Sequence, residues 1–318
     1  MVNELIGVMR ERIPKGSNLA NSLMEILCMG KEAIYRRLRG EVAFTFEEVS
    51  LISQHLGISL DKIVGRRMLN DTMFDLNLLH TGDPIESYYE ILVRYAKLFD
   101  LLRDDPTASV ATASNLIPFT FYSPYECLSK FRLGRWIYHH GKMKPPASLS
   151  DLQVPDKVPQ MHWKLSASIR QLSHTSFIWD YNIFRSIVKE IRYFAGLDLL
   201  SAEDVRNMKK ELGLLLSELE AVTMTGEFSK RHSLAIYLSD INFEATYTYV
   251  EKGDFQACLF RVYSINSMDS QNPRMCNIQK NWIQSLKRHS TLISQSSEIQ
   301  RRQFFNEQRE IVESLQEA

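Results

Sequence analysis

Residues 17–65 of this chain read SNLANSLMEILCMGKEAIYRRLRGEVAFTFEEVSLISQHLGISLDKIVG. Apolar residues recur there at helical spacing up to residue 27, and the pattern stops at Cys28-Met29-Gly30. A second helix is predicted over residues 31–39, and Gly40 ends it because glycine adopts the left-handed conformation at little cost. Two short helices joined by about three residues are typical of a helix-turn-helix.

A third helix is predicted to begin after Thr45, because Glu48 follows at the spacing of a capping box. The apolar periodicity of this helix ends at Gly57. The side chains expected to face a shared core are Leu19, Leu23, Ile26, Leu27, Ala33, Ile34, Leu38, Phe46, Val49, Ile52 and Leu56. The segment is therefore expected to form a small helical domain of its own.

The second helix is strongly basic. It carries Lys31, Arg36, Arg37 and Arg39 against Glu32, which gives it a net charge of +3. An α-helix fits the major groove of DNA, where Arg and Lys side chains can bond guanine. A basic run by itself is equally well explained as a solvated surface. Its place as the second helix of the pair favours DNA binding.

The charge balance of the whole segment limits what one copy can do. Residues 1–65 contain 8 Lys and Arg against 8 Asp and Glu. Nonspecific affinity for DNA comes mainly from phosphate contacts, so one neutral copy is expected to bind weakly. We therefore expect two copies to act together on double-stranded DNA.

The order of these helices resembles the lambda-repressor-like (Cro/repressor) helix-turn-helix family over residues 1–65, about a fifth of the chain. The positions that carry the resemblance are Leu23, Leu27, Ile34, Gly40, the helix 46–56, Gly57, Ile58, Ser59, Leu60 and Asp61. The resemblance implies that helix 31–39 enters the major groove. The residues it implies in base contacts are Lys31, Glu32, Ala33, Tyr35 and Arg36, and Arg37 and Arg39 complete the predicted DNA-binding set. Gly30 replaces the family's usual Ser or Thr cap and no Gln follows it, which leaves the preferred base sequence open.

Composition narrows the class of protein. The 318 residues have a net charge of zero, so there is no polybasic excess for a membrane surface or a nucleic-acid tail. No apolar run approaches the roughly 18 residues of a membrane span, and the N-terminus lacks the apolar core of a signal peptide. The four cysteines are scattered without close pairs, which indicates reduced thiols. These features predict a cytoplasmic protein with no membrane partner.

We expect three parts along the chain. Residues 1–65 form the helix-turn-helix DNA-binding domain, and residues 66–82 form a connector. The connector is too apolar for a flexible linker; it either packs on the next domain or sets the angle between two DNA-binding heads. Residues 83–318 form an α+β regulatory and dimerisation domain. Its predicted parts are a helical region 83–226, a β-hairpin region 234–265 and terminal helices 273–318.

The predicted fold class is mainly α with a small antiparallel β element. It combines an N-terminal helix-turn-helix bundle with a large, mostly helical C-terminal domain. The tyrosines of the hairpin, Tyr247 and Tyr249, either lie on a sheet face packed against helices, which we favour, or form a ligand platform. The apolar stripes of helices 201–225 and 297–315 either pack across a twofold axis or are used inside one fold.

Catalytic and cofactor motifs are missing from the sequence. It contains no GxxxxGK[ST], GxGxxG, GxSxG or HExxH. His139 and His140 are neighbours on one predicted helix and point apart, so no metal site is expected there. The hydroxyl-rich segment 289–298 is either an anion site at a helix N-terminus or, as we favour, a turn between helices. We predict no enzymatic activity, no cofactor and no metal.

The function predicted from the sequence is a sequence-specific DNA-binding transcription regulator, with helix 31–39 in the major groove. Residues 83–318 would dimerise it and could also sense a small ligand of unknown identity. This part resembles only uncharacterised regions that follow small helix-turn-helix heads in some bacterial regulators. The alternative is a small-molecule-binding protein or enzyme whose N-terminal helices mediate protein contacts.

Overall fold

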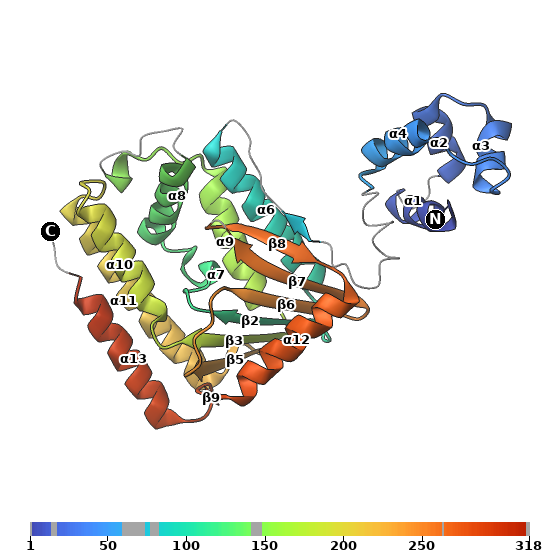
Figure 1. The fold of residues 1–318 in the computed structure, drawn as a ribbon. Helices are drawn as coiled ribbons and strands as arrows, with labels where there is room; N and C mark the ends of the chain where they lie inside the picture. The colour runs from blue at the N-terminus through green and yellow to red at the C-terminus, as the bar shows by residue number, and fades with distance from the viewer. Residues whose placement is uncertain are drawn as a thin grey trace. The chain divides into compact units, whose positions relative to one another are not determined.

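The chain folds into two compact units, Met1–Met73 and Phe74–Ala318 (Figure 1). The computed structural model describes residues 2–13, 18–58, 74–76, 83–140, 148–262 and 264–315. Of the predicted connector 66–82, residues 74–76 are described, and the other positions lie outside the described residues. Asp75–Leu76 forms strand β1 of the second unit.

The first unit is built from helices. Its described helices are α1 (Val2–Arg12), α2 (Leu19–Leu27), α3 (Lys31–Leu38) and α4 (Phe46–Leu56). The core of this unit consists of Leu5, Met9, Ala20, Leu23, Ile34, Ile52 and Ile58. The three helices predicted within residues 17–57 are therefore confirmed, and α2 packs against both α3 and α4.

The ends of these helices follow from local chemistry. The Asn18 side chain accepts a hydrogen bond from the Ala20 amide at 2.9 Å and caps α2. Cys28 ends α2 in the left-handed conformation, at φ 51°. Gly40 follows α3 at φ 78°, where a side chain would be strained. Thr45 and Glu48 form the predicted capping box of α4.

One predicted core residue of the first unit is on the surface. Phe46 is 83% exposed, so its expected inward position is wrong. Side chains in a helix lean towards its N-terminus. Phe46 is the first residue of α4 and has no preceding turn of the helix beneath it.

The second unit is organised around a nine-stranded mixed sheet. The strands are β1 (Asp75–Leu76), β2 (Ser109–Ser114), β3 (His174–Asp180), β4 (Glu227–Ser229), β5 (His232–Ser239), β6 (Tyr247–Lys252), β7 (Phe255–Val262), β8 (Asn266–Ser270) and β9 (Ser290–Leu292). Their order is β1-β8-β7-β6-β2-β3-β5-β4, and β9 also pairs with β5. The pairs β2–β3 and β3–β5 are parallel, and the other pairs are antiparallel.

The predicted fold class, mainly α with a small antiparallel element, is therefore wrong. Strands β2 and β3 lie inside the region 83–226 that was predicted to be helical. Nearly all of their residues are buried, because helices cover the sheet on both faces. Without a solvated face, the two strands lack the polar–apolar alternation that identifies a strand in sequence. The predicted β6–β7 hairpin is confirmed, with Gly253 in its turn at φ 52°.

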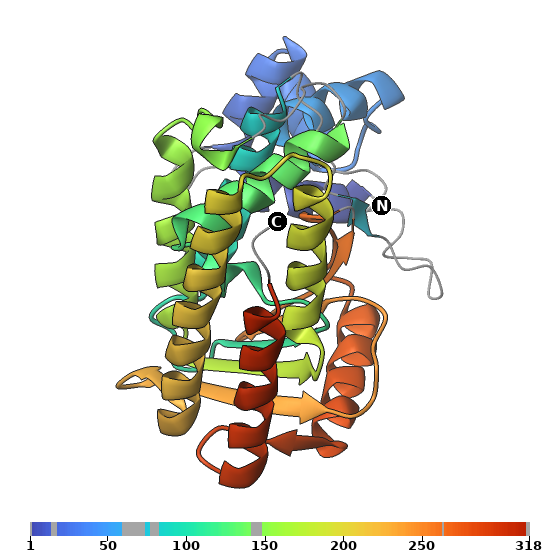
Figure 2. The same ribbon diagram turned by 90° about the vertical axis from the view of Figure 1, so that its left-hand side faces the viewer.

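Helices cover both faces of the sheet unequally (Figures 1 and 2). The helical elements are α6 (Pro84–Leu102), α7 (Phe119–Tyr122), α8 (Glu126–His140), the short 3-10 helix η1 (Leu149–Asp151), α9 (Lys157–Arg170), α10 (Ile183–Ala195), α11 (Ala202–Thr225), α12 (Pro273–Arg288) and α13 (Glu298–Glu313). Helix α12 lies against one face, over β2, β5, β6 and β7. Helices α6 to α11, together with α13, share the main core with the other face.

The strand β2 shows how the two faces differ. Ala111 and Ala113 face α12. Val110, Thr112 and Ser114 alternate with them and face the helices of the main core. The hydroxyl groups of Thr112 and Ser114 therefore lie on the side of the sheet that faces the main core, near the carboxyl end of β2.

The apolar stripes of the two long helices are used inside this unit. The buried residues of α11 and α13 belong to the main core, and the two helices pack on each other. Neither stripe is free to pack across a twofold axis. Tyr249 is buried under α12, so the favoured interpretation of the hairpin tyrosines as packing residues is confirmed.

Candidate functional site

The predicted DNA-binding residues all lie on or next to α3, and they differ in exposure. Lys31, Glu32, Arg36 and Arg39 are exposed, and Ala33 and Tyr35 are half-buried. The ammonium group of Lys31 lies 5.9 Å from the centre of the Tyr35 ring. Ile34 is in the core and Tyr35 packs against it, so these two side chains hold one side of α3 inward. The four exposed side chains point outward, and Ala33, which was expected to face the core, is not part of it.

Arg37 differs from the other predicted residues because it is paired within the unit. Its Nε and Nη2 donate to the two carboxylate oxygens of Glu48 at 2.9 and 2.7 Å. The side chains are only 14% and 9% exposed. Arg37 Nη1 also donates to the Ala33 carbonyl at 3.3 Å. Its guanidinium therefore fastens α3 to α4.

Glu48 is electrostatically well satisfied. Besides Arg37, its carboxylate accepts a hydrogen bond from the Thr45 amide at 2.9 Å. The hydrogen bond from Arg37 is the main cause that lowers the pKa of Glu48, with burial opposing it. The carboxylate therefore stays ionised at neutral pH and holds the start of α4 against α3.

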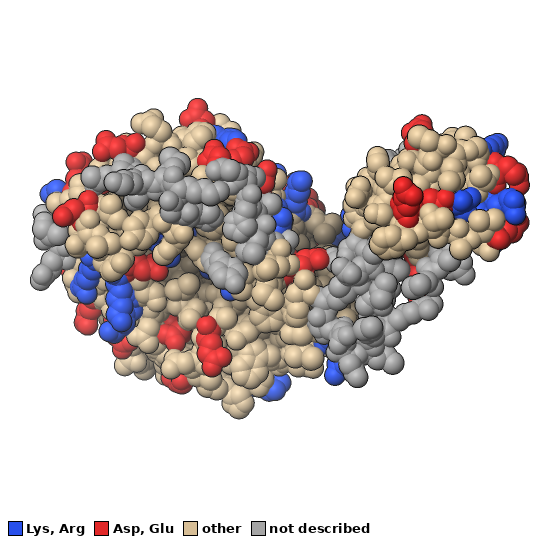
Figure 3. Space-filling view, turned by 45° about the horizontal axis from the view of Figure 1, so that its top comes forward, with Lys and Arg blue, Asp and Glu red and all other residues tan. Residues whose placement is uncertain are grey.

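Carboxylates border the exposed cations of α3 (Figure 3). Arg39 Nε donates to Glu41 at 2.6 Å, and Arg39 Nη2 lies 3.4 Å from Glu32. Arg36 Nε lies 3.5 Å from the second Glu41 oxygen. The Arg39 hydrogen bond is the main cause that lowers the pKa of Glu41. Exposed pairs of this kind are weak, so Glu41 does not hold either arginine firmly.

The sequence prediction overlooked Glu41. Its signal is its position immediately after Gly40, where the left-handed turn directs the chain back along α3. The backbone amide of Glu41 bonds the Arg36 carbonyl at 2.9 Å and fixes that return.

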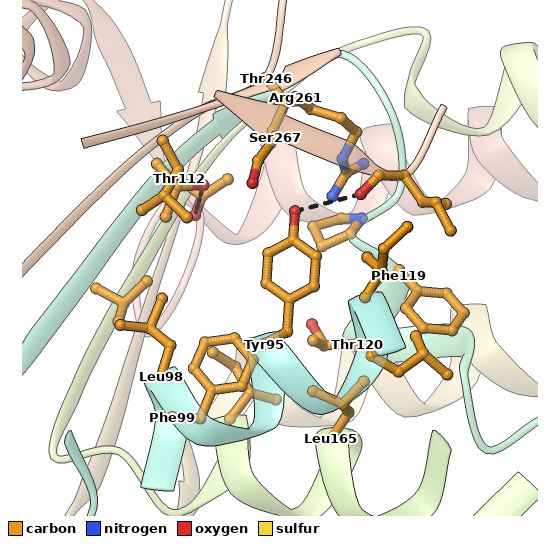
Figure 4. Close-up of a pocket in the computed structure, with 18 of the residues that line it drawn as sticks. Tyr95, Leu98, Phe99, Thr112, Phe119, Thr120, Leu165, Thr246, Arg261 and Ser267 are labelled. Carbon is orange, nitrogen blue, oxygen red and sulfur yellow. Dashed lines mark hydrogen bonds between the residues drawn. The ribbon is translucent and has the colours of Figure 1, made fainter. Parts of the chain in front are cut away.

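A second candidate site is a cavity of about 90 Å³ inside the second unit (Figure 4). It lies between the sheet and the helices α6, α7, α8 and α9. On the sheet side, Thr112 Oγ1 and Thr248 Oγ1 are 3.1 Å apart. From α6, the Tyr95 hydroxyl reaches across and donates to the Ile265 carbonyl at 3.4 Å.

Two arginines line this cavity. Arg132 of α8 is 8% exposed; its Nη1 donates to the Tyr122 hydroxyl at 2.6 Å, and its guanidinium lies 4.5 Å from the Phe119 ring centre. Its Nε is buried without a hydrogen-bond partner among the described residues. Arg261 of β7 points towards the Tyr95 hydroxyl (Figure 4). Burial, followed by the like charge of Arg132, lowers the pKa of Arg261.

A neutral polar pair lies beside Arg132. The Tyr88 hydroxyl and His162 Nε2 are 3.0 Å apart in the core between α6 and α9. Burial, and then the charge of Arg132, lowers the pKa of His162 to about 4. Burial also raises the pKa of Tyr88. At neutral pH, Arg132 is therefore the charged member of this group.

Sequence reasoning missed both arginines of the cavity. The signal for Arg261 was its place in the alternation of β7, on the same face as Ala257 and Leu259. The signal for Arg132 was its place between Phe131 and Leu133, which are both buried. A cation in a buried apolar run needs a partner or a ligand.

The remaining predicted features show no separate site. Within the described ranges, no three His, Cys, Asp or Glu side chains gather as metal ligands. No helix in the described part of the chain is long and apolar enough to cross a bilayer. In the hydroxyl-rich segment, Ser296 Oγ donates to the Leu292 carbonyl at 2.7 Å, and Arg301 Nη1 donates to Ile293 and Ser296 carbonyls. The predicted turn is wrong for Ser290–Leu292, which forms strand β9 and pairs with β5. The rest of the segment connects β9 to α13, and the Ser297 side chain does not cap that helix.

Comparison of the chain with protein-family models, with curated proteins and with solved structures found no match. Its function therefore has to be inferred from α3 and from the cavity of the second unit.

Proposed function

We propose that this protein is a sequence-specific DNA-binding transcription regulator that performs no chemistry. The observation that carries the proposal is the exposed basic face of α3. This helix is the second of two joined by a three-residue turn, and Arg37 and Glu48 hold it against α4. A helix that projects cations from a fixed frame is suited to the major groove.

The proposed contacts follow from exposure. Lys31, Glu32 and Arg36 reach base edges, together with the half-buried Ala33 and Tyr35. Arg39, next to the end of α3, contacts a phosphate. Arg37 contributes by positioning α3, because its donors are already bonded to Glu48.

We further propose that the protein acts as a cytoplasmic homodimer, and that residues 74–318 dimerise it. Residues 1–65 have no net charge, so one copy gains little from phosphate contacts. Two copies would place their α3 helices about 34–36 Å apart on one side of the duplex.

The test is binding of the purified full-length protein to a genomic fragment library at fixed salt. A set of fragments should be enriched and then bound more tightly than scrambled DNA in fluorescence anisotropy. The double variant Lys31→Ala/Arg36→Ala should lose this preference. Arg12→Ala removes an exposed arginine of α1 in the same unit and should keep it. If no fragment is bound more tightly than scrambled DNA, the regulator proposal is wrong.

A further inference from the structure

We propose that the cavity between the sheet and α6 is a binding site for a short-chain carboxylate, whose head group lies between Arg132 and Arg261. This ligand belongs to the second unit, and its binding does not depend on whether the first unit binds DNA.

The first support is the pairing of arginines elsewhere in the chain. The partly buried Arg37, Arg135, Arg170 and Arg309 each form an ion pair with a glutamate. Arg132 and Arg261 have no carboxylate within ion-pairing distance among the described residues. The charge of Arg132 acts on Glu190, but the Glu190 carboxylate is bound by Arg135.

Two guanidiniums without a carboxylate partner in one site are unfavourable, because like charges repel. Burial removes hydration from Arg132 and part of it from the half-buried Arg261, and the Tyr122 hydroxyl offsets only part of the cost at Arg132. That repulsion contributes to the lowered pKa of Arg261. An anion placed between them would remove both penalties, and the buried Nε of Arg132 is a donor still without a described partner.

The lining of the cavity changes from apolar to polar along the sheet. Towards one end, the floor consists of Val110 and Val250, which are paired across β2 and β6. Towards the carboxyl end of β2, it changes to hydroxyl groups and a cation, including Thr112 and Arg261. Ligands of parallel strands usually bind near this end. The lining includes no acidic side chain among the described residues.

The helix side completes an amphipathic space. Phe99 and Leu165 contribute apolar surface, and Tyr95 brings its hydroxyl next to Arg261 (Figure 4). A carboxylate fits two guanidiniums and neighbouring hydroxyls through its two oxygens. Its aliphatic stem would then lie against the apolar residues.

The volume restricts the size of the ligand. The cavity of about 90 Å³ is smaller than the roughly 150 Å³ cavity that accommodates benzene. In proportion to benzene, which has six non-hydrogen atoms, it suits an anion of about four. Acetate has this size, and propionate and butyrate are the next larger members of the series.

The experiment is calorimetric titration and thermal unfolding of the full-length protein with acetate, propionate and butyrate. Acetamide, propionamide and butyramide are the neutral controls of the same shapes, and inorganic phosphate is the anion without a stem. We expect at least one carboxylate to bind saturably and to raise Tm with concentration, and its amide to do neither. Equal effects of that carboxylate and its amide, tighter binding of phosphate, or no saturable binding of any carboxylate up to millimolar concentrations would overturn the proposal.

Variants separate a ligand site from a structural role. Arg261→Met and, as a second variant, Arg132→Met should each weaken carboxylate binding at least tenfold. Arg261→Met should also keep or raise the Tm of the ligand-free protein, because it removes an unpaired covered charge. Arg185→Met, at an exposed position of α10, is the control and should change neither quantity. Unchanged binding in both cavity variants, or a large loss of ligand-free Tm in Arg261→Met, contradicts the assignment.

Discussion

Glu48 connects two neighbouring helices through one carboxylate. It completes the capping box at the start of α4 and accepts both hydrogen bonds from Arg37 of α3. The capping box follows from the sequence because Thr45 and Glu48 are three residues apart. The ion pair does not follow from the sequence, because Arg37 and Glu48 are 11 residues apart and meet only when α3 packs on α4.

Replacing Glu48 tests this connection. We expect Glu48→Gln to lower the free energy of unfolding of the first unit by about 2 kcal/mol, because a charged, partly buried hydrogen-bonded pair is lost. The matched control is Glu47→Gln, an exposed carboxylate in the same first turn. Urea unfolding of both variants measures the difference, and equal stability would show that the pair contributes nothing.

The same pair fixes the sign of a pH effect. The folded pKa of Glu48 is lowered, so its contribution is fully present above the ordinary glutamate pKa of about 4.3. It is lost as the pH falls through the lowered folded value, because the unfolded chain then binds the proton more tightly. The stability difference between wild type and Glu48→Gln should therefore shrink in acid.

Arg36 of α3 and Arg39, which follows this helix, are expected to contribute differently to DNA binding. Arg36→Ala should cost roughly 1–3 kcal/mol on the preferred sequence and relax its specificity, if Arg36 contacts a base. Arg39→Ala should weaken binding to all sequences alike and reduce the dependence on salt. Anisotropy titrations over a salt series on specific and scrambled DNA distinguish the two effects. Equal losses with specificity retained in both variants would exclude this division.

At the scale of elements, those marked by residues close together in sequence could be predicted, and strands that pair with distant parts of the chain could not. The helix α6 could be predicted because Asp83 caps it and Pro84 occupies its first turn. The hairpin β6–β7 could be predicted because its strands are adjacent in sequence and alternate. Strand β2 reads SVATAS, and its parallel partner β3 begins 65 residues later, at the pair Ser109–His174. Small residues buried on both faces leave no periodic signal.

The cavity escaped the sequence analysis for the same reason. Arg132 and Arg261 come from a helix and a strand that the sheet brings together. Each could be recognised as an arginine at an inward position. That they share one space depends on β2, β6 and β7 being neighbours, which requires the missed strand β2.

The contact between α6 and α9 is expected to depend on pH. His162 of α9, bonded to Tyr88 of α6, has a folded pKa of about 4 against about 6.5 in the unfolded chain. Between these values the unfolded chain binds a proton that the folded chain excludes, so stability falls as the pH drops through this range. The loss by pH 4 should be about 3 kcal/mol.

The variant His162→Gln isolates this effect, because it keeps a hydrogen-bonding group that does not titrate. Its stability relative to wild type should improve by about the same 3 kcal/mol between pH 7 and pH 4. His174→Gln, at an exposed position of β3, is the control. Urea unfolding at both pH values gives the comparison, and a constant difference for His162→Gln would contradict a low folded pKa.

At the scale of the whole molecule, the two units divide the proposed tasks. The first unit has its own core and the exposed basic helix, but no net charge over residues 1–65. The second unit contains about three quarters of the chain and the whole nine-stranded sheet. Since a neutral head gains little from phosphate contacts, strong binding requires that two heads act on one duplex.

Light scattering of the full-length chain and of residues 1–73 tests this division. We expect the full-length protein to be a dimer and the fragment to be a folded monomer. Coupling two heads makes the second contact intramolecular, so the full-length protein should bind a two-site duplex at least a hundredfold more tightly than the fragment, as linked binding commonly gains about 10²–10⁴. On a duplex with one half-site, the two should bind with similar affinity, because the second head then has no specific contact. A monomeric full-length protein, or a dimeric fragment, would remove dimerisation from the second unit, whatever the cavity binds.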